Sequence, residues 1–138
     1  MHPLGITIKR QMATRKKSKN QNQRHEYAIV ISCCNEEKRL PDTDFISFAI
    51  RHPEVLLCFV DDGSKDKTHA LLIGMQGKSP ANIKVYPLEK RKGKAEAIKQ
   101  GMDYVSQNFN VKLLGFLDSD LSIRPEAWLQ MAATKLIP

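Results

Sequence analysis

Two acidic clusters in this 138-residue chain each follow an apolar run, and their residue types and spacing could support metal and phosphate chemistry. The first cluster is Asp61-Asp62, after the apolar residues 58–60. The second is Asp118-Ser119-Asp120, after the apolar residues 115–117. Because carboxylates are costly inside a core, we expect each cluster where a buried strand emerges. Two such strand ends in one parallel sheet would direct carboxylates into one crevice, where open α/β sheets bind ligands.

Asp118 and Asp120 form an Asp-x-Asp pattern that suits a divalent cation. In an extended segment the two carboxylates would lie on the same side, with Ser119 turned away. Hard oxygen ligands suit Mg²⁺ or Mn²⁺, and Mg²⁺ prefers one or two carboxylates together with substrate phosphates. The pattern therefore favours a nucleotide diphosphate bridged to the protein by a metal, although many turns contain Asp-x-Asp without a metal.

The first acidic pair continues into Gly63-Ser64, and two interpretations of this segment remain open. In one, the segment is a turn and a helix N-cap, with Gly63 supplying backbone freedom. In the other, a carboxylate accepts a hydrogen bond from a base N–H or a ribose hydroxyl, as the acidic residue of dinucleotide-binding folds does.

The basic cluster Arg91-Lys92-Gly93-Lys94 precedes a helical pattern. It is either a solvated loop or a phosphate-binding helix start, because lysine charge, a glycine and a helix N-terminus all favour phosphate. The spacing is not that of a P-loop. No Gly-x-Gly-x-x-Gly follows the first strand-like run, which argues against a dinucleotide-binding Rossmann domain.

The elements that would position these residues alternate between strand and helix. Apolar runs predict strands at 27–33, 55–60, 83–86 and 111–117. Four helices are expected: over 43–51, after a cap at Ser64 or Asp66, over 94–105, and from Pro125 onward. In the last helix, Ala127, Trp128 and Met131 would face the core. The alternation implies an α/β fold: a Rossmann-like three-layer α/β/α arrangement with a mostly parallel sheet.

The net charge of +7 is concentrated at the N-terminus. Residues 1–25 contain seven Lys or Arg residues and no acid, whereas residues 26–138 contain 15 basic and 15 acidic residues. We therefore divide the chain into a basic disordered arm, 1–25, and a folded, neutral part, 26–138, that is not expected to bind nucleic acid. The arm would serve as a solubilising tail, which we favour, or would contact an anionic membrane surface or nucleic acid.

The three cysteines, Cys33, Cys34 and Cys58, have neither the spacing of a disulfide framework nor that of a zinc site. Reduced thiols fit a cytoplasmic protein. The expected location is the cytoplasm, with peripheral contact at the cytoplasmic face of a membrane through residues 1–25.

Four runs of the chain, at 35–41, 60–68, 92–102 and 115–122, together resemble family 2 glycosyltransferases of the GT-A type. In particular they resemble polyprenyl- or dolichyl-phosphate glucosyl- or mannosyltransferases, and the resemblance covers residues from about 27 to 130. The family pattern after the first strand is Pro-x-Tyr-Asn-Glu. Asn35 and Glu36 match this pattern, whereas Ser32 and Cys34 depart from it.

The resemblance implies roles for the residues that match the family. Asp118 and Asp120 would be catalytic and would hold Mg²⁺ or Mn²⁺ with the diphosphate, while Asp62 and the Val60 backbone would contact the base or ribose. The residues expected to bind the nucleotide sugar are Ser32, Cys34, Glu36, Val60, Asp62, Lys94, Asp118, Ser119 and Asp120.

The implied reaction is inverting transfer of a hexose from a donor of the UDP-glucose or GDP-mannose class to a lipid phosphate acceptor. The chain ends about 18 residues beyond Asp120, so we expect an incomplete donor-binding portion with little or no transferase activity alone. The alternative is a non-catalytic nucleotide-binding or assembly module of the same fold. Whether the chain forms a homo-oligomer is left open.

Overall fold

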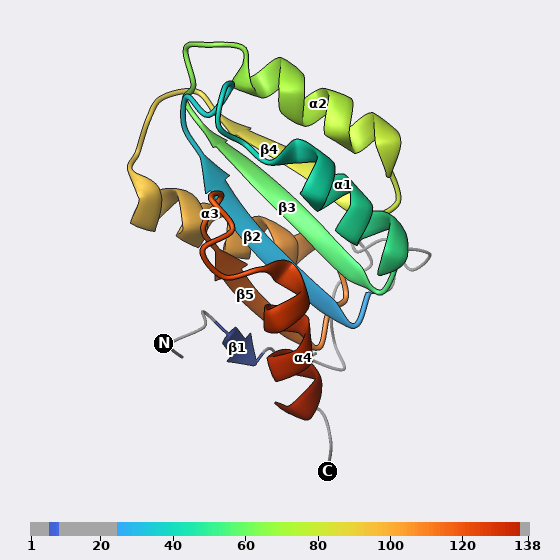
Figure 1. Ribbon diagram of the computed structural model, residues 1–138. Helices are drawn as coiled ribbons and strands as arrows, with labels where there is room; N and C mark the ends of the chain where they lie inside the picture. The colour runs from blue at the N-terminus through green and yellow to red at the C-terminus, as the bar shows by residue number, and fades with distance from the viewer. Residues whose placement is uncertain (1–5, 9–24, 136–138) are drawn as a thin grey trace.

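The computed structural model describes residues 6–8 and 25–135, which form one sheet with helices on both faces (Figure 1). The strands have the order β1-β5-β2-β3-β4; β2 to β5 are parallel, and β1 is antiparallel to β5. The predicted α/β fold is confirmed. The elements are β1 (Ile6–Ile8), β2 (Tyr27–Cys33), α1 (Asp42–Arg51), β3 (Val55–Asp62), α2 (Thr68–Lys78), β4 (Ile83–Leu88), α3 (Lys94–Asn108), β5 (Leu113–Leu117) and α4 (Pro125–Lys135).

The two central strands, β2 and β3, are buried almost throughout, and their alternate side chains serve opposite faces of the sheet. One face packs against α1, α2 and α4, with Phe45, Leu72 and Trp128 in that layer of the core. The other face packs against α3 through Ala97 and Val105. Figure 1 shows this arrangement, with α3 behind the sheet and the other helices in front. Because both faces are covered, the strands appear in the sequence as continuous apolar runs.

The strands β3 and β4 extend further than predicted. β3 includes Asp61 and Asp62 as its last two residues, which are both buried and pair with β4, so the strand ends at the second carboxylate rather than before the first. β4 continues through Pro87 to Leu88. It lies at the edge of the sheet, where the missing N–H of proline is tolerated.

The prediction of which α4 residues face the core is only partly correct. Trp128 is fully buried, but Ala127 and Met131 are exposed. The helix instead faces the sheet with Trp128 and Ala132, four residues apart and therefore on one side of the helix.

The prediction of disorder over residues 1–25 differs from the structure at Ile6–Ile8, which form β1. Isoleucine and threonine are β-branched and favour strands, and the edge of β5 offers backbone groups for pairing. The rest of this segment up to residue 24, with its predicted membrane contact, lies outside the described residues. None of the helices in 25–135 is both long enough and apolar enough to cross a membrane.

Candidate functional site

A cleft of about 450 Å³ opens at the carboxyl ends of the central parallel strands. The strand order reverses here, because β3 and β4 lie on one side of β2 and β5 lies on the other. Loops that leave the sheet on opposite sides of such a switch point diverge and leave room for a ligand. The cleft is lined by Ser32, Cys33, Cys34, Glu36, Arg39, Asp62, Arg91, Lys94, Asp118, Ser119 and Asp120.

The cleft brings together every predicted site residue except Val60. The Val60 side chain is fully buried and faces α3, where Gly101 lies against it. Three lining residues, Cys33, Arg39 and Arg91, were not predicted as site residues. Arg91 belongs to the basic cluster, and Arg39 follows Glu36 by three residues, so local charge was the available signal for both.

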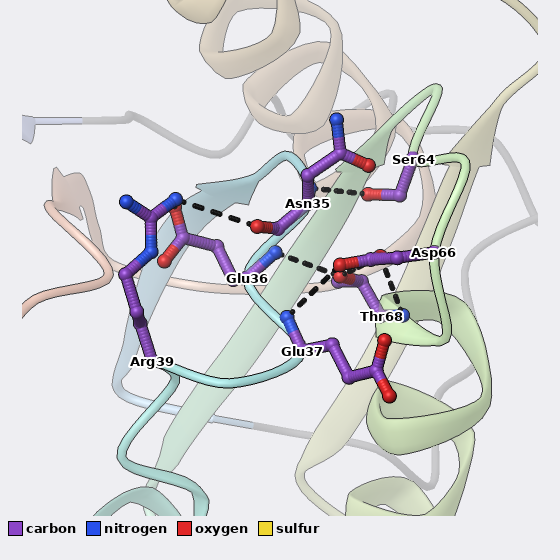
Figure 2. Close-up of polar contacts among 7 residues, drawn as sticks. All are labelled: Asn35, Glu36, Glu37, Arg39, Ser64, Asp66 and Thr68. Carbon is purple, nitrogen blue, oxygen red and sulfur yellow. Dashed lines mark hydrogen bonds and ion pairs between the residues drawn. The ribbon is translucent and has the colours of Figure 1, made fainter.

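The loop after β2 is held to the loop after β3 by hydrogen bonds between backbone and side chains (Figure 2). The Asn35 N–H donates to Ser64 Oγ at 3.0 Å, and Asn35 Oδ1 accepts from the Lys65 N–H at 2.8 Å. The Glu36 N–H donates to Thr68 Oγ1 at 2.8 Å. Asn35 has a φ of 55°, a left-handed conformation that asparagine adopts more readily than most residues. The Asn35 amide thus shapes the loop, and the Glu36 side chain remains available to the cleft.

The N-cap residue of α2 is Lys67, which makes no side-chain cap hydrogen bond, so neither Asp66 nor Ser64 is the cap that the sequence predicted; Asp66 nevertheless accepts hydrogen bonds at the start of the helix. Its Oδ1 accepts from the Thr68 N–H at 2.9 Å and from the Thr68 hydroxyl at 2.5 Å, and its Oδ2 accepts from the Glu37 N–H at 3.3 Å (Figure 2). These hydrogen bonds, above all that from the Thr68 hydroxyl, lower the pKa of Asp66. Ser64, the other predicted cap, is instead paired with Asn35.

Glu36 and Arg39 meet at the wall of the cleft. Arg39 Nη2 lies 3.3 Å from Glu36 Oε2 and also donates to the Asn35 carbonyl at 3.3 Å (Figure 2). The Arg39 side chain is largely exposed, and exposed ion pairs contribute little stability. The guanidinium can therefore exchange these contacts for an anionic ligand.

Asp61 and Asp62 are both buried, but they face different partners. Asp61 Oδ1 accepts from the Ser64 N–H at 3.1 Å, and its Oδ2 lies 3.4 Å from His69 Nδ1, so Asp61 stabilises the turn after β3. Asp62 accepts from the backbone N–H groups of Lys92 and Gly93. The turn interpretation of this segment therefore describes Asp61, while Asp62 reaches the basic cluster.

Asp118 and Asp120 form the opposite wall, at the end of β5. Asp118 is paired with Lys94, the first residue of α3, and both side chains are partly exposed. Asp120 Oδ1 accepts from the Ser122 N–H at 2.9 Å, and hydrogen bonds from Ser122 lower the pKa of Asp120. Residues 119 and 120 lie in a turn rather than in the extended segment that was predicted, and Ser119 also lines the cleft.

The donor set of this wall fits a hard divalent cation. The described residues contain no group of three or more His, Cys, Asp or Glu side chains that could hold a metal by themselves. Two ionised carboxylates at the rim of a cleft suit Mg²⁺ or Mn²⁺ when phosphate oxygens and water complete the coordination. Asp118 and Asp120 are the residues that would hold the cation.

Cys34 lies on the cleft wall at intermediate exposure. Burial raises the pKa of its thiol, and the neighbouring positive charge of Arg91 opposes that shift. Cys34 is therefore a neutral thiol at physiological pH, and its contribution to ligand binding is by contact rather than by charge.

Comparison with known proteins agrees with this fold. The model of glycosyl transferase family 2 matches residues 28–137. Poly-beta-1,6-N-acetyl-D-glucosamine synthase of Staphylococcus epidermidis is 27% identical over 100 residues, which is 72% of this chain and 23% of that protein. The chain therefore spans about a quarter of the length of this relative.

Solved structures share the same arrangement. TarS 1–349 from S. aureus, also solved in complex with UDP and with UDP-GlcNAc, has a TM-score of 0.63 and 22% identity. The match covers 78% of this chain and 31% of TarS 1–349. Mannosyltransferase PcManGT from Pyrobaculum calidifontis, in complex with GDP-Man and Mn²⁺, has a TM-score of 0.53 and 17% identity, over 70% of this chain and 28% of that structure. These two likenesses show the fold. Since the family model matches most of its length, the chain belongs to glycosyl transferase family 2.

Proposed function

We propose that the cleft binds a nucleotide diphosphate sugar and that the chain is the donor-binding part of an inverting glycosyltransferase. The observation that carries the proposal is the meeting of Asp118 and Asp120 with Arg39, Arg91 and Lys94 in one cleft at the switch point of the sheet. Cationic side chains suit a diphosphate, and the carboxylates suit a metal. Complexes of the similarly folded TarS with UDP-GlcNAc and of PcManGT with GDP-Man and Mn²⁺ support the proposal.

In the proposed reaction, an acceptor oxygen forms a bond to the anomeric carbon as the bond from that carbon to the diphosphate breaks. Negative charge then accumulates on the leaving diphosphate. Lys94, the first residue of α3, and Arg91, in the loop before it, would stabilise this charge. A divalent cation held by Asp118 and Asp120 would supply additional stabilisation of this negative charge.

We propose a lipid phosphate as the acceptor, following the resemblance of the sequence to polyprenyl-phosphate sugar transferases. A phosphate acceptor is already an anionic nucleophile, so the reaction needs no strong general base. The basic residues of 1–25 would hold the chain at the anionic cytoplasmic face of a membrane. Co-sedimentation with anionic but not with neutral vesicles, weakening as salt is raised, is the expected result. Equal sedimentation with both vesicle types would reject the membrane contact.

Calorimetric titration of UDP-glucose and GDP-mannose, with and without Mn²⁺, tests donor binding directly. At least one donor should bind more tightly with Mn²⁺, and Asp120→Ala should lose that enhancement. Metal-independent binding of equal strength in both forms would remove the role assigned to Asp118 and Asp120. Donor binding without release of UDP or GDP on addition of a polyprenyl phosphate would favour the alternative, a non-catalytic nucleotide-binding module.

A further inference from the structure

Leu121 directly follows Asp120 and has a left-handed backbone conformation. It lies in the loop between β5 and α4, residues 118–124, which can be followed in Figure 1. Its φ is 60°, and Asn35 is the other non-glycine residue with a positive φ in the part of the chain that the structure describes. In this conformation the Cβ of an L-residue crowds the following carbonyl oxygen, so a leucine here costs free energy that a glycine would not.

The Leu121 side chain provides an apolar contact that glycine could not make. It is partly buried and packs, like Ile123, against the core on the face of the sheet that α1, α2 and α4 cover. Ser122 and Arg124, which alternate with these two residues, are exposed. The loop is therefore anchored to the core at two positions, and only Leu121 is held there with a positive φ.

The strained residue lies between this anchor and the two carboxylates of the cleft wall. Asp120 Oδ1 accepts from the Ser122 N–H at 2.9 Å, and the direction of that N–H depends on the φ and ψ of Leu121. Strained backbone persists only where the surrounding structure enforces it, and it clusters at ligand sites. We propose that Leu121 is a positioning residue: its anchored, left-handed backbone turns the chain so that Asp118 and Asp120 both face the cleft, where they would hold a divalent cation. This inference rests on the proposed function.

Two other roles for Leu121 would give different results. If the side chain contributed only apolar packing, Ile123 in the same layer of the core would behave in the same way. If a left-handed backbone alone directed the carboxylates, glycine would hold the cation as well as leucine does, because glycine adopts this conformation without strain. Positioning by an anchored backbone predicts instead that glycine weakens cation binding although it relieves the strain.

The test measures the binding of UDP and GDP by calorimetry, with and without Mn²⁺, in the unsubstituted chain and in Leu121→Gly. For the nucleotide that binds, the gain in affinity from Mn²⁺ should fall about tenfold in the glycine variant, equivalent to about 1.4 kcal/mol. The affinity without Mn²⁺ should change by less than about twofold. Leu121→Met keeps an apolar side chain of similar volume and should retain the gain. A gain retained by the glycine variant, or lost by the methionine variant, would overturn the proposal.

Ile123→Ala is the matched control, because it removes apolar packing from the same layer of the core at a residue without a positive φ. It should lower the urea concentration at which the chain unfolds and keep the gain from Mn²⁺. Leu121→Ala tests the strain itself. Alanine lacks the anchor and is strained at a positive φ, so this variant should unfold at a lower urea concentration than Leu121→Gly. The opposite order, or loss of the gain in Ile123→Ala, would count against the proposal.

Amide hydrogen exchange of Ser122 in the ligand-free chain, followed by NMR, makes the anchoring testable without nucleotide or metal. Exchange should become faster in Leu121→Gly, because the turn that the Asp120 carboxylate closes would open more often, and should stay unchanged in Leu121→Met. Unchanged exchange in Leu121→Gly would reject the positioning role. If Mn²⁺ gave no gain in the unsubstituted chain, the proposed metal role would fail, and the exchange rates would still decide whether Leu121 fixes the turn.

Discussion

Gly101 lies where α3 crosses the two central strands, and replacing it with alanine tests how closely the helix approaches the sheet. A Cβ at this position would lie 2.5 Å from Val60 Cγ2 and 2.7 Å from Val30 Cγ1. Both valines are fully buried. Because valine is β-branched and its rotamers are restricted, neither side chain can readily turn away. The helix must therefore move to admit one methyl group.

The expected cost follows from two opposing effects. Overpacking a core costs about 1–3 kcal/mol, and two simultaneous clashes with stiff side chains place Gly101→Ala near the upper value. Alanine gains about 1 kcal/mol over glycine in a helix interior. The net loss in free energy of unfolding should be about 2 kcal/mol. Lys94 begins the same helix, so the displacement should also weaken UDP binding.

Gly74→Ala in α2 is the matched control, because no atom lies within 4 Å of the added Cβ. Gly74→Ala changes helix propensity and the entropy of the unfolded chain by the same amounts as Gly101→Ala. Without a clash, it should stabilise the protein by about 0.5–1 kcal/mol. Urea denaturation followed by circular dichroism measures both variants. If Gly101→Ala were as stable as Gly74→Ala, the close approach of α3 to the sheet would be refuted.

Three further predictions concern single side chains. Lys94→Met removes the partner of Asp118, so it should strengthen Mn²⁺ binding in the absence of nucleotide and weaken UDP binding. Calorimetry measures both affinities, and an unchanged Mn²⁺ affinity would contradict the ion pair. Asn82→Ala removes a buried amide that donates to carbonyls near the end of α1 and the start of β3, and should cost about 2–3 kcal/mol in chemical denaturation; a loss under about 0.5 kcal/mol would show that these acceptors find other partners. The lowered pKa of Asp66 adds stability that is present above its ordinary value of 3.8 and is lost as the pH falls through the lowered pKa. Asp66→Asn should therefore flatten the pH dependence of the free energy of unfolding below about pH 5, and an unchanged acid limb would disprove this linkage.

The order and type of the elements from residue 25 onward were predictable because burial on both faces of a parallel sheet leaves a local signal. The strand predicted over 27–33 is β2, Tyr27–Cys33, to the residue. Its neighbours on both sides are parallel strands, so its residues other than Ser32, which lines the cleft, are buried and the run is almost wholly apolar. The same reasoning placed Asp62, Asp118 and Asp120 at one edge of the sheet, since parallel strands place their carboxyl ends together. The other predicted residues of the cleft, such as Ser32, Cys34 and Glu36, came from the resemblance to the family.

The features that the sequence did not predict depend on contacts between distant segments. The sequence predicted that β3 would end at Val60, because a carboxylate inside a strand is costly. The structure meets this cost for Asp62 with two N–H groups from residues 92 and 93. The pairing of Ile6–Ile8 with β5 is likewise a contact between segments that lie far apart in the sequence. Neither the hydrogen bonds of Asp62 nor this strand pairing produces a local sequence pattern from which it could be predicted.

The two acidic clusters differ in burial and in hydrogen-bond partner, and these differences decide how readily each carboxylate can exchange its partner for a ligand. Asp62 is paired with backbone N–H groups and can release them only if a loop moves. Asp118 is 42% exposed and is paired with the flexible Lys94 side chain, which can transfer to a diphosphate and leave the carboxylate free for a cation. When the pair separates, the diphosphate would replace Asp118 as the partner of Lys94, and the cation would replace Lys94 as the partner of Asp118. Each ligand should therefore increase the affinity for the other.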